Sequence, residues 1–159
     1  MERIRIPVRR LDAAALDEKL GVLAGSAPVQ AGAPAQEPGL RDALIFKSLT
    51  RARLEEALAA LNRVQAGRGA LKAVLTPTNQ TWSLRSLLGE LEKEEALMNC
   101  YQRLHTRVQE ADQRLGAQPA GTLPEALEKA RKILQSDSPS LPELQEAEKE
   151  LDLLLESLA

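Results

Sequence analysis

A helix-start signal occurs twice near the end of this chain, as Thr122-Leu123-Pro124-Glu125 and as Ser140-Leu141-Pro142-Glu143. In such a box the hydroxyl accepts a backbone N–H and the Pro occupies a position whose N–H needs no partner. The Glu reaches back to the capping residue. A leucine-bearing run follows each box, so each predicts a helix, and together they predict a short αα-hairpin over residues 117–159.

A longer helix is indicated by apolar residues that recur in steps of four and three, the spacing of a coiled-coil seam. This seam consists of Leu97, Tyr101, Leu104, Val108, Ala111 and Leu115. The final segment has the same spacing at Leu144, Ala147, Leu151, Leu154 and Leu158. Each seam requires another helix to pack against.

The choice of core residues is narrow, because Phe46, Trp82 and Tyr101 are the only aromatic residues of the chain. A core of Leu, Ala, Val and Ile suits narrow contacts between helices. We therefore expect an all-α protein, namely an elongated antiparallel helical hairpin or bundle with coiled-coil character plus the short C-terminal αα-hairpin.

Four segments are predicted from composition. They are a basic extended arm with a short helix over 1–24, an Ala/Pro/Gly linker over 25–39, a long helical hairpin over 40–116 and the acidic hairpin over 117–159. In the arm, Ile4, Ile6 and Val8 alternate with arginines, which is strand periodicity, and Pro7 restricts it to an edge strand or an extended arm. The arm is a flexible tail, or it adds to a partner's sheet edge or contacts phosphate.

The long hairpin is predicted from leucine spacing and from chain breakers. A helix over 40–66 is expected to end at Gly67 and Gly69, and a further turn or two of helix is expected over 70–75. Pro77 breaks the chain because it disfavours helical geometry at the preceding residue. The longest helix then runs from Thr81 or Ser83 to Leu115.

Charge is distributed unevenly although the formal net charge is only −2. Seven Lys/Arg against three Asp/Glu give +4 over 40–75, whereas four against nine give −5 over 122–159. We expect the acidic segment to dock on the basic one, within one molecule or between two. Since the sequence contains no secretory signal and no apolar stretch of membrane-spanning length, we expect a cytoplasmic protein.

Residues for chemistry are scarce. The single histidine, His105, follows the single cysteine, Cys100, by five residues, so on one helix their side chains point about 140° apart. One cysteine and one histidine supply neither a zinc cluster nor the ligands of a di-iron bundle. Gly67-Arg68-Gly69 lacks the context of a phosphate loop and is interpreted as a turn. We predict no catalytic residue, no metal site, no cofactor and no enzyme.

Two short motifs stand before and after the predicted basic helix: a Val-Gln-x-Gly and Pro segment from Val29 to Pro38, and an Asn-x-Thr loop, Asn79-Gln80-Thr81, followed by Ser83-Leu84 at the start of a long helix. In this order they resemble the motifs of the septicolysin-like family of small bacterial helical proteins. The likeness covers Leu20 to about Leu115. It implies a helical hairpin with coiled-coil character and no catalytic residues.

The sequence favours a non-enzymatic helical module for protein–protein interaction or scaffolding, which associates with itself or with a partner helix. The predicted partner-binding residues are Leu97, Tyr101, Leu104, Val108, Leu144, Leu151, Leu154 and Leu158. The alternative is a nucleic-acid-associated accessory protein that uses the basic arm and the basic helix. Its predicted phosphate contacts are Arg3, Arg5, Arg9, Arg10, Arg51 and Arg63.

Overall fold

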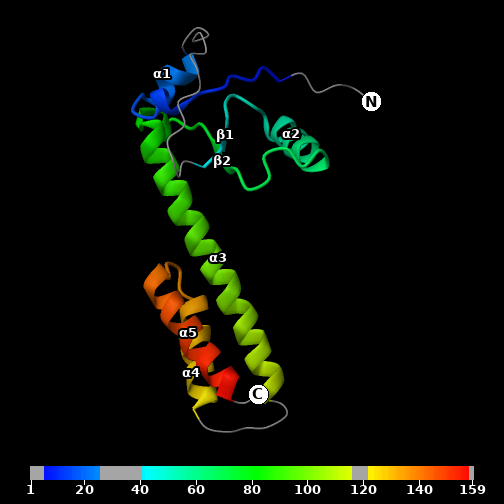
Figure 1. Cartoon of the computed structure of the whole chain (residues 1–159), viewed down its shortest axis with the longest axis vertical. Coiled ribbons are helices and arrows are strands. Elements are labelled where there is room, and N and C mark those ends of the chain that lie inside the picture. Colours follow the sequence, from blue (N-terminus) through cyan, green and yellow to red (C-terminus); the bar gives the residue numbers. More distant parts are fainter. Residues whose placement is uncertain (1–5, 26–40, 116–121, 158–159) are drawn as a thin grey trace. The chain divides into compact units, whose positions relative to one another are not determined.

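A computed structural model describes residues 6–25, 41–115 and 122–157 of the chain. Within these ranges the protein is mostly helical, with five α-helices and one two-stranded parallel sheet (Figure 1). The chain divides into two compact units, Met1–Glu92 and Lys93–Ala159. Each unit is described by itself.

The sheet corrects the expectation of an all-α fold, which holds only in the coarser sense that the protein is mostly helical. Strands β1 (Ala43–Phe46) and β2 (Leu71–Val74) pair in parallel, in a register that places Ala43 opposite Leu71. Helix α2 (Arg51–Arg63) connects them. The predicted helix over 40–66 therefore begins only at Arg51, and the predicted turns over 70–75 are mostly strand.

The start of α2 is set by local chemistry. Thr50 has extended backbone geometry, and its hydroxyl accepts a hydrogen bond from the Arg53 amide at 3.4 Å, as an N-cap does. Ala57 is buried on α2, and the leucines of the same face are half-buried. The helix ends earlier than predicted: after Arg63 the residue with positive φ is Gln65, and the Gln65 and Ala66 amides donate to the Asn62 and Leu61 carbonyls, so Gly67 and Gly69 lie beyond the cap that we expected them to form.

The core of unit 1 is built from leucines of several short elements. The 3₁₀ turn η1 (Ala13–Ala15) and helix α1 (Leu20–Gly25) bring the N-terminal residues to the sheet and to the start of α3. The buried residues are Leu16, Leu20, Leu23, Leu71, Leu84, Leu87 and Leu88. Backbone hydrogen bonds fix this junction, since the Leu20 amide donates to the Trp82 carbonyl at 2.9 Å and the Arg85 amide to the Leu16 carbonyl at 2.7 Å.

The N-terminal arm does not follow its predicted alternation. In the described part of the arm, Ile6 to Arg10, no residue is in a strand. Val8 is 91% exposed, whereas Arg9 is half-buried and donates from Nη1 to the Leu23 carbonyl. Arg9, and not Val8, is therefore the residue that contacts the rest of unit 1 at this point of the arm. Ile4 lies outside the described residues.

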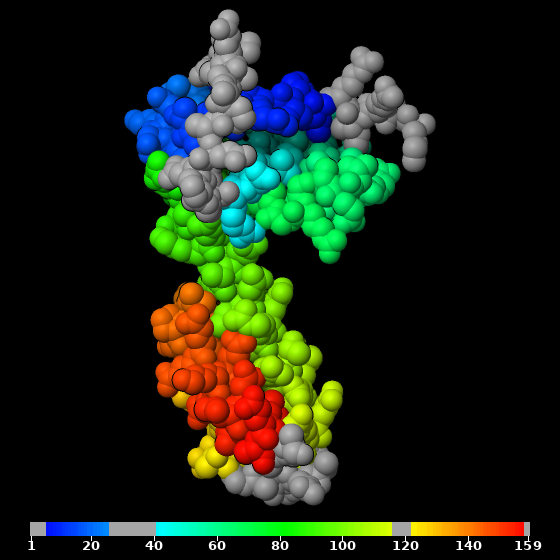
Figure 2. Space-filling model, viewed as in Figure 1, coloured from blue at the N-terminus to red at the C-terminus, as the bar shows by residue number. Residues whose placement is uncertain are grey.

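Unit 2 packs the later turns of α3 (Leu84–Leu115) with α4 (Leu123–Leu134) and α5 (Leu141–Ser157). The predicted seam is confirmed, because Leu104, Val108 and Ala111 are buried between the helices. In Figure 2, α5 lies along α3 within this unit. In α5 the buried set is Leu144, Ala147, Leu151 and Leu155. Leu155 thus replaces the predicted Leu154, which is half-buried.

Both boxed helix starts are confirmed as starts, but only one forms the full box. Ser140 donates its amide to Glu143 Oε2 at 2.9 Å, and the Glu143 amide donates back to the Ser140 hydroxyl at 3.4 Å. Thr122 already has helical φ and ψ and makes no capping bond through its side chain. In the described part of the chain, no helix is both long and apolar enough to span a bilayer.

Candidate functional site

The predicted partner-binding leucines lie in the core of unit 2. Leu104, Leu144 and Leu151 are fully buried and Val108 is 8% exposed. Leu97, Tyr101 and Leu154 are half-buried against the same cluster, and Leu158 lies outside the described residues. The two seams thus pack on each other within one chain, and their buried residues present no free surface to a partner.

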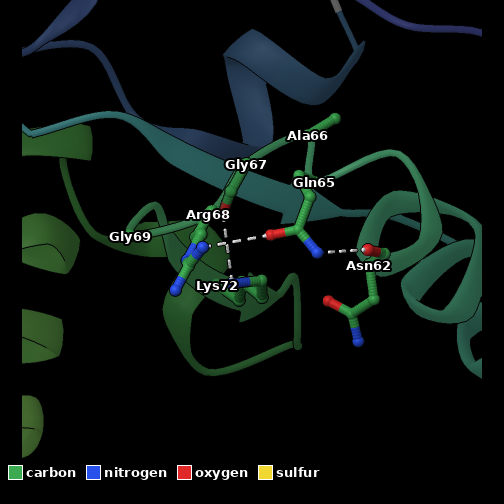
Figure 3. Close-up of a pocket in the computed structure, with 7 residues that line it drawn as sticks. All are labelled: Asn62, Gln65, Ala66, Gly67, Arg68, Gly69 and Lys72. Atoms are coloured by element: carbon green, nitrogen blue, oxygen red, sulfur yellow. Dashed lines mark hydrogen bonds between the residues drawn. The ribbon is translucent and has the colours of Figure 1, made fainter.

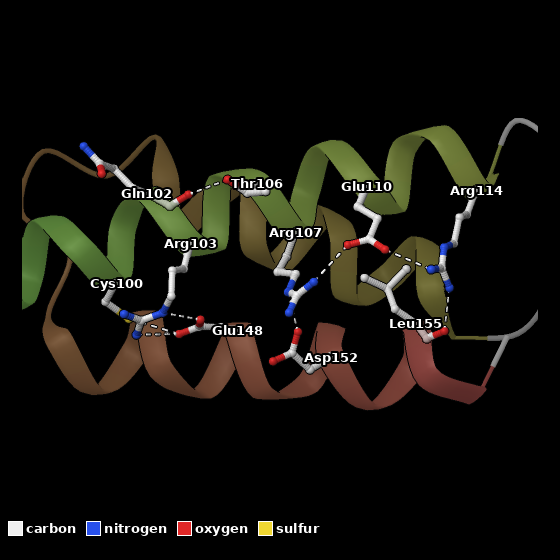
Figure 4. Close-up of polar contacts among 10 residues, drawn as sticks. All are labelled: Cys100, Gln102, Arg103, Thr106, Arg107, Glu110, Arg114, Glu148, Asp152 and Leu155. Atoms are coloured by element: carbon white, nitrogen blue, oxygen red, sulfur yellow. Dashed lines mark hydrogen bonds and ion pairs between the residues drawn. The ribbon is translucent and has the colours of Figure 1, made fainter. Parts of the chain in front are cut away.

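The acids of α5 also find partners within unit 2 (Figure 4). Arg103 of α3 binds Glu148 with both nitrogens of its fork, at 2.6 and 3.1 Å. Arg107 binds Asp152 at 2.6 Å, and Arg114 donates to the Leu155 carbonyl at 2.7 Å near the C-terminal end of α5. The acidic segment, which we expected to dock on residues 40–75, is matched by cations of α3 and likewise by Lys129 of α4.

Cys100 and His105 do not form a reactive pair. The Cys100 thiol is fully buried and donates to Glu148 Oε2 at 3.5 Å, and burial raises its pKa. A buried, protonated thiol is a poor nucleophile. His105 is exposed on the same helix. Over the ranges described above, no three His, Cys, Asp or Glu side chains gather as metal ligands would.

The predicted phosphate-binding arginines are not brought together. Arg51 and Arg63 are the first and last residues of α2, which separates them by about 18 Å along the axis. Arg51 is paired with Glu55 at 2.9 Å, and Arg63 donates to the Ala59 carbonyl at 3.3 Å. Arg10 is exposed, and Arg3 and Arg5 lie outside the described residues. Of this set, Arg63 lies beside the loop described next.

The loop between α2 and β2 borders an open depression of about 410 Å³ (Figure 3). Its lining is polar and contains no acid: Asn62, Gln65, Ala66, Gly67, Arg68, Gly69 and Lys72. Arg68 donates to the Gln65 side-chain oxygen at 3.3 Å. Lys72 donates to the carbonyls of Gly67 and Ala70 at 3.4 and 3.1 Å. Both cations thus engage neutral acceptors.

The backbone of this loop alternates in the sign of φ. Gln65, Gly67 and Gly69 have φ of 55°, 67° and 79°, whereas Ala66 and Arg68 between them do not have positive φ. A side chain at Gly67 would be unfavourable, because its φ is positive and a Cβ there would approach Leu44 Cδ1 to 2.8 Å, which requires the Leu44 side chain to shift. The amides of Gly67, Arg68 and Gly69 find no acceptor in the part of the chain that is described.

Charge in this part of the sequence is entirely positive. No Asp or Glu occurs between Ala57 and Gly89, whereas Arg63, Arg68, Lys72 and Arg85 do. Arg85 is paired with Asp17 at 2.9 Å. Arg68 and Lys72 line the depression and Arg63 ends α2 just before the loop, and none of the three has a carboxylate partner within the described ranges.

The sheet has an open edge at β1. In a parallel pair the residues of each strand alternate between bonding inward and facing outward. The Leu71 amide donates to the Asp42 carbonyl at 2.9 Å and the Leu75 amide to the Phe46 carbonyl at 2.8 Å, which leaves Ala43 and Ile45 facing outward. Their N–H and C=O groups have no hydrogen-bond partner among the residues placed in the structure. On β2 the outward-facing residues are Lys72 and Val74, of which the Val74 carbonyl accepts from the Asn79 side chain at 3.0 Å, and the other outward main-chain groups have no partner among the described residues.

Neither the loop from Gln65 to Gly69 nor the outer edge of β1 is predicted as a binding surface by the sequence. Gly67-Arg68-Gly69 was interpreted only as a turn, although the absence of acids over 57–89 was a usable signal. The open edge belongs to β1, a strand within residues 40–66, which the leucine spacing predicted to be one helix.

Comparison with known proteins matches part of the chain to a family model. The family is described as a domain of unknown function (DUF3783), and it matches residues 42–98. These residues span β1, α2, β2 and the first turns of α3, so the match includes the loop and the sheet edge. No curated protein and no solved structure matches the chain.

Proposed function

We propose that this chain is a non-enzymatic protein-interaction module that binds an extended segment of a partner through the outer edge of β1. The observation that carries the proposal is that the main-chain N–H and C=O groups of Ala43 and Ile45 have no hydrogen-bond partner among the described residues. Exposed strand edges bind peptides by adding a strand, because main-chain hydrogen bonds supply affinity. The proposal keeps the interaction role expected from the sequence but moves its surface from the leucine seams to the sheet.

The charges near β1 favour an acidic partner segment over a second copy of this chain. Arg41 and Lys47 flank the strand, and Asp42 is the single acid between them. Antiparallel self-pairing centred on Leu44 would place Arg41 opposite Lys47 of the other copy at both ends, and like charges opposite each other are destabilising. An extended segment with an apolar centre and acidic ends avoids this repulsion.

The septicolysin-like resemblance implies no catalytic residues, which agrees with a non-enzymatic role, but the helical hairpin that it implies does not fit the sheet of β1 and β2. The family match contributes the location, because residues 42–98 contain β1. Neither comparison names a partner.

The test is binding of a fluorescent peptide of alternating valine and threonine with glutamates at both ends. Substitution Ala43→Pro removes one outward N–H and leaves the ladder to β2 intact, since Pro is tolerated as the first residue of a strand. We expect the variant to bind the peptide about fivefold to tenfold more weakly, the loss of one main-chain hydrogen bond.

Ala52→Pro is the matched control, because Ala52 lies exposed in the first turn of α2, where proline is accepted. Equal weakening by both substitutions, or no binding by the unaltered chain, would contradict the proposal. Sedimentation equilibrium tests whether a second copy of the chain binds the β1 edge. If the unaltered chain is a dimer and Ala43→Pro is a monomer, the ligand of the edge is a second copy and not an acidic segment of another protein.

Nucleic-acid association is the second candidate function. It is favoured by one observation, the acid-free stretch over 57–89 with its four cations. Phosphate contacts make affinity fall steeply as salt rises. Binding of duplex or single-stranded DNA at about 50 mM salt that is lost at about 200 mM salt would support this candidate, and no binding at the lower concentration would remove it.

A further inference from the structure

We propose that the loop from Gln65 to Gly69 is a binding site for a phosphate group. The alternating sign of φ over these five residues is the geometry of an anion-binding nest, in which successive amides turn toward one side. The three amides that such a nest presents, those of Gly67, Arg68 and Gly69, are the ones left without an acceptor in the described chain. Backbone geometry and hydrogen-bonding thus point independently to the same three groups.

Two cations border the nest and complete the donor set. The side chains of Arg68 and Lys72 line the same depression of about 410 Å³ as Gly67 and Gly69. Their present hydrogen bonds, of 3.1 to 3.4 Å, are long and go to neutral oxygens. Charge-assisted bonds to an anion are shorter and about twice as strong, so an entering phosphate displaces these contacts at little cost.

The lining selects for phosphate and against a nucleobase. Three amides and two cations suit the several acceptor oxygens of a phosphate group. The lining includes no aromatic side chain on which a base would stack. No Asp or Glu in the sequence from Ala57 to Gly89 repels a dianion, and Asp42, which the sheet brings beside Leu71, follows Arg41, which donates to the Gly69 carbonyl at 2.6 Å. Free phosphate and the backbone of a polynucleotide present the same chemistry here.

The site has donors distinct from those of the β1 edge on which the proposed function rests, although Arg41 beside β1 donates to the Gly69 carbonyl at 2.6 Å. Its donors are in the loop before β2, and the edge donors are Ala43 and Ile45 of β1. The two proposals can therefore fail separately. If the chain binds phosphate but not the peptide, the proposed function fails and the phosphate site stands; if it binds the peptide but not phosphate, the phosphate site fails and the proposed function stands.

The test is a titration of the ¹⁵N-labelled full chain with inorganic phosphate, followed by ¹H–¹⁵N spectra. Sodium chloride at equal ionic strength is the reference. We expect saturable downfield shifts of the Gly67, Arg68 and Gly69 amide protons, because each gains a charge-assisted hydrogen bond. Shifts that are absent at these amides, or that chloride reproduces, would overturn the proposal.

Paired substitutions give the second measurement. Arg68→Gln with Lys72→Gln should weaken phosphate binding by about tenfold or more, since two cationic donors are lost. Lys132→Gln with Lys149→Gln is the control, because it removes the same charge from exposed positions of α4 and α5. Equal weakening in the two double variants would mean that net charge, not the loop, governs binding, and would overturn the proposal.

A short oligo(dT) strand identifies the source of the phosphate. If it shifts the same three amides at concentrations about tenfold or more below those of inorganic phosphate, a polynucleotide backbone is the ligand. If inorganic phosphate binds equally well or better, the ligand is free phosphate or a small phosphate ester. Either result supports the phosphate site, and saturation by neither probe overturns it.

Discussion

The side chain of Glu148 is only 16% exposed, and both of its carboxylate oxygens accept hydrogen bonds from α3. Arg103 donates to both oxygens, and the Cys100 thiol donates to one of them. The Arg103 guanidinium therefore holds the pKa of Glu148 below its usual value. A carboxylate largely removed from water remains charged here because the contacts compensate for its lost hydration.

We expect Glu148→Gln to lower the free energy of unfolding by about 1 kcal/mol at neutral pH. Because the pKa of Glu148 is lower in the folded than in the unfolded chain, this stabilisation is present above the unfolded value, about 4.3, and is lost as pH falls through the folded value. Urea unfolding at pH 7 and at about pH 3 should thus show a difference that shrinks in acid.

The control for this prediction is Glu146→Gln, on the same helix. Glu146 is 76% exposed and lies 3.6 Å from Lys129, so its removal should change stability little. An effect of Glu146→Gln as large as that of Glu148→Gln would show that general acidity of α5, not the contact with Arg103, is responsible.

Cys100 provides a second prediction for a single residue. Its thiol is fully buried and burial raises its pKa, so both access and thiolate formation are suppressed in the folded chain. We expect a thiol reagent to label it at least about 100-fold more slowly in the folded protein than in urea, since labelling requires opening of unit 2. Labelling at similar rates in both conditions would contradict the burial of Cys100.

The two helix-start boxes differ in a measurable way as elements. Ser140 exchanges hydrogen bonds with Glu143, whereas the Thr122 hydroxyl makes no capping bond. Ser140→Ala should therefore lower stability by about 1 kcal/mol, and Thr122→Ala by much less. Urea unfolding curves of the two variants compare two boxes that share Leu-Pro-Glu after the capping residue, and equal losses would show that both caps act in solution.

Replacing glycine by alanine should have opposite effects on stability in the loop before β2 and in α3. Gly67→Ala should be destabilising by about 1 to 2 kcal/mol, because its φ of 67° is unfavourable for alanine and the new Cβ would meet Leu44. Gly89→Ala, in α3 with open space around its Cα, should instead stabilise by about 0.5 to 1 kcal/mol. Thermal unfolding of both variants measures the opposite signs.

Helices were predictable from this sequence and the sheet was not, for a physical reason. The seam from Leu97 to Leu115 repeats over many turns, and a repeated 3.6-residue pattern has few other solutions. The run Ala43–Phe46 is too short for periodicity to distinguish a strand from a buried helix, and its partner Leu71–Val74 is distant in sequence. The Thr50 cap was the available signal that a helix begins after residue 50.

The same limit applies to the candidate sites. Glycines at 67 and 69 correctly indicated a break after the helix but not its end, because the helix stops at Arg63 and Gln65 takes the positive φ there; sequence alone does not show this, nor that three amides of the loop remain open. The leucine seams were correctly predicted to pack on helices. Whether those helices belonged to the same chain depended on long-range contacts, and the structure places them in one chain.

At the scale of the whole molecule, the described residues form two separate cores of unequal size. Seven buried residues form the core of unit 1, and twelve form that of unit 2. Since burial of apolar surface is the main stabilising contribution, the smaller core should open at a lower free energy. The candidate binding surfaces both belong to unit 1, so the recognition part of the protein is expected to be its less stable part.

Hydrogen exchange should resolve the two units as separate cooperative blocks. Leu71→Ala removes a buried side chain of unit 1, and Leu151→Ala one of unit 2, each at a cost of about 2 to 4 kcal/mol. We expect Leu71→Ala to speed exchange of the Leu75 amide, which donates to Phe46 across the sheet, and to leave the Leu104 amide of unit 2 unchanged. Leu151→Ala should do the reverse. If either substitution sped exchange equally in both units, the chain would unfold as one block and the loop and the sheet edge would share the stability of the helical bundle.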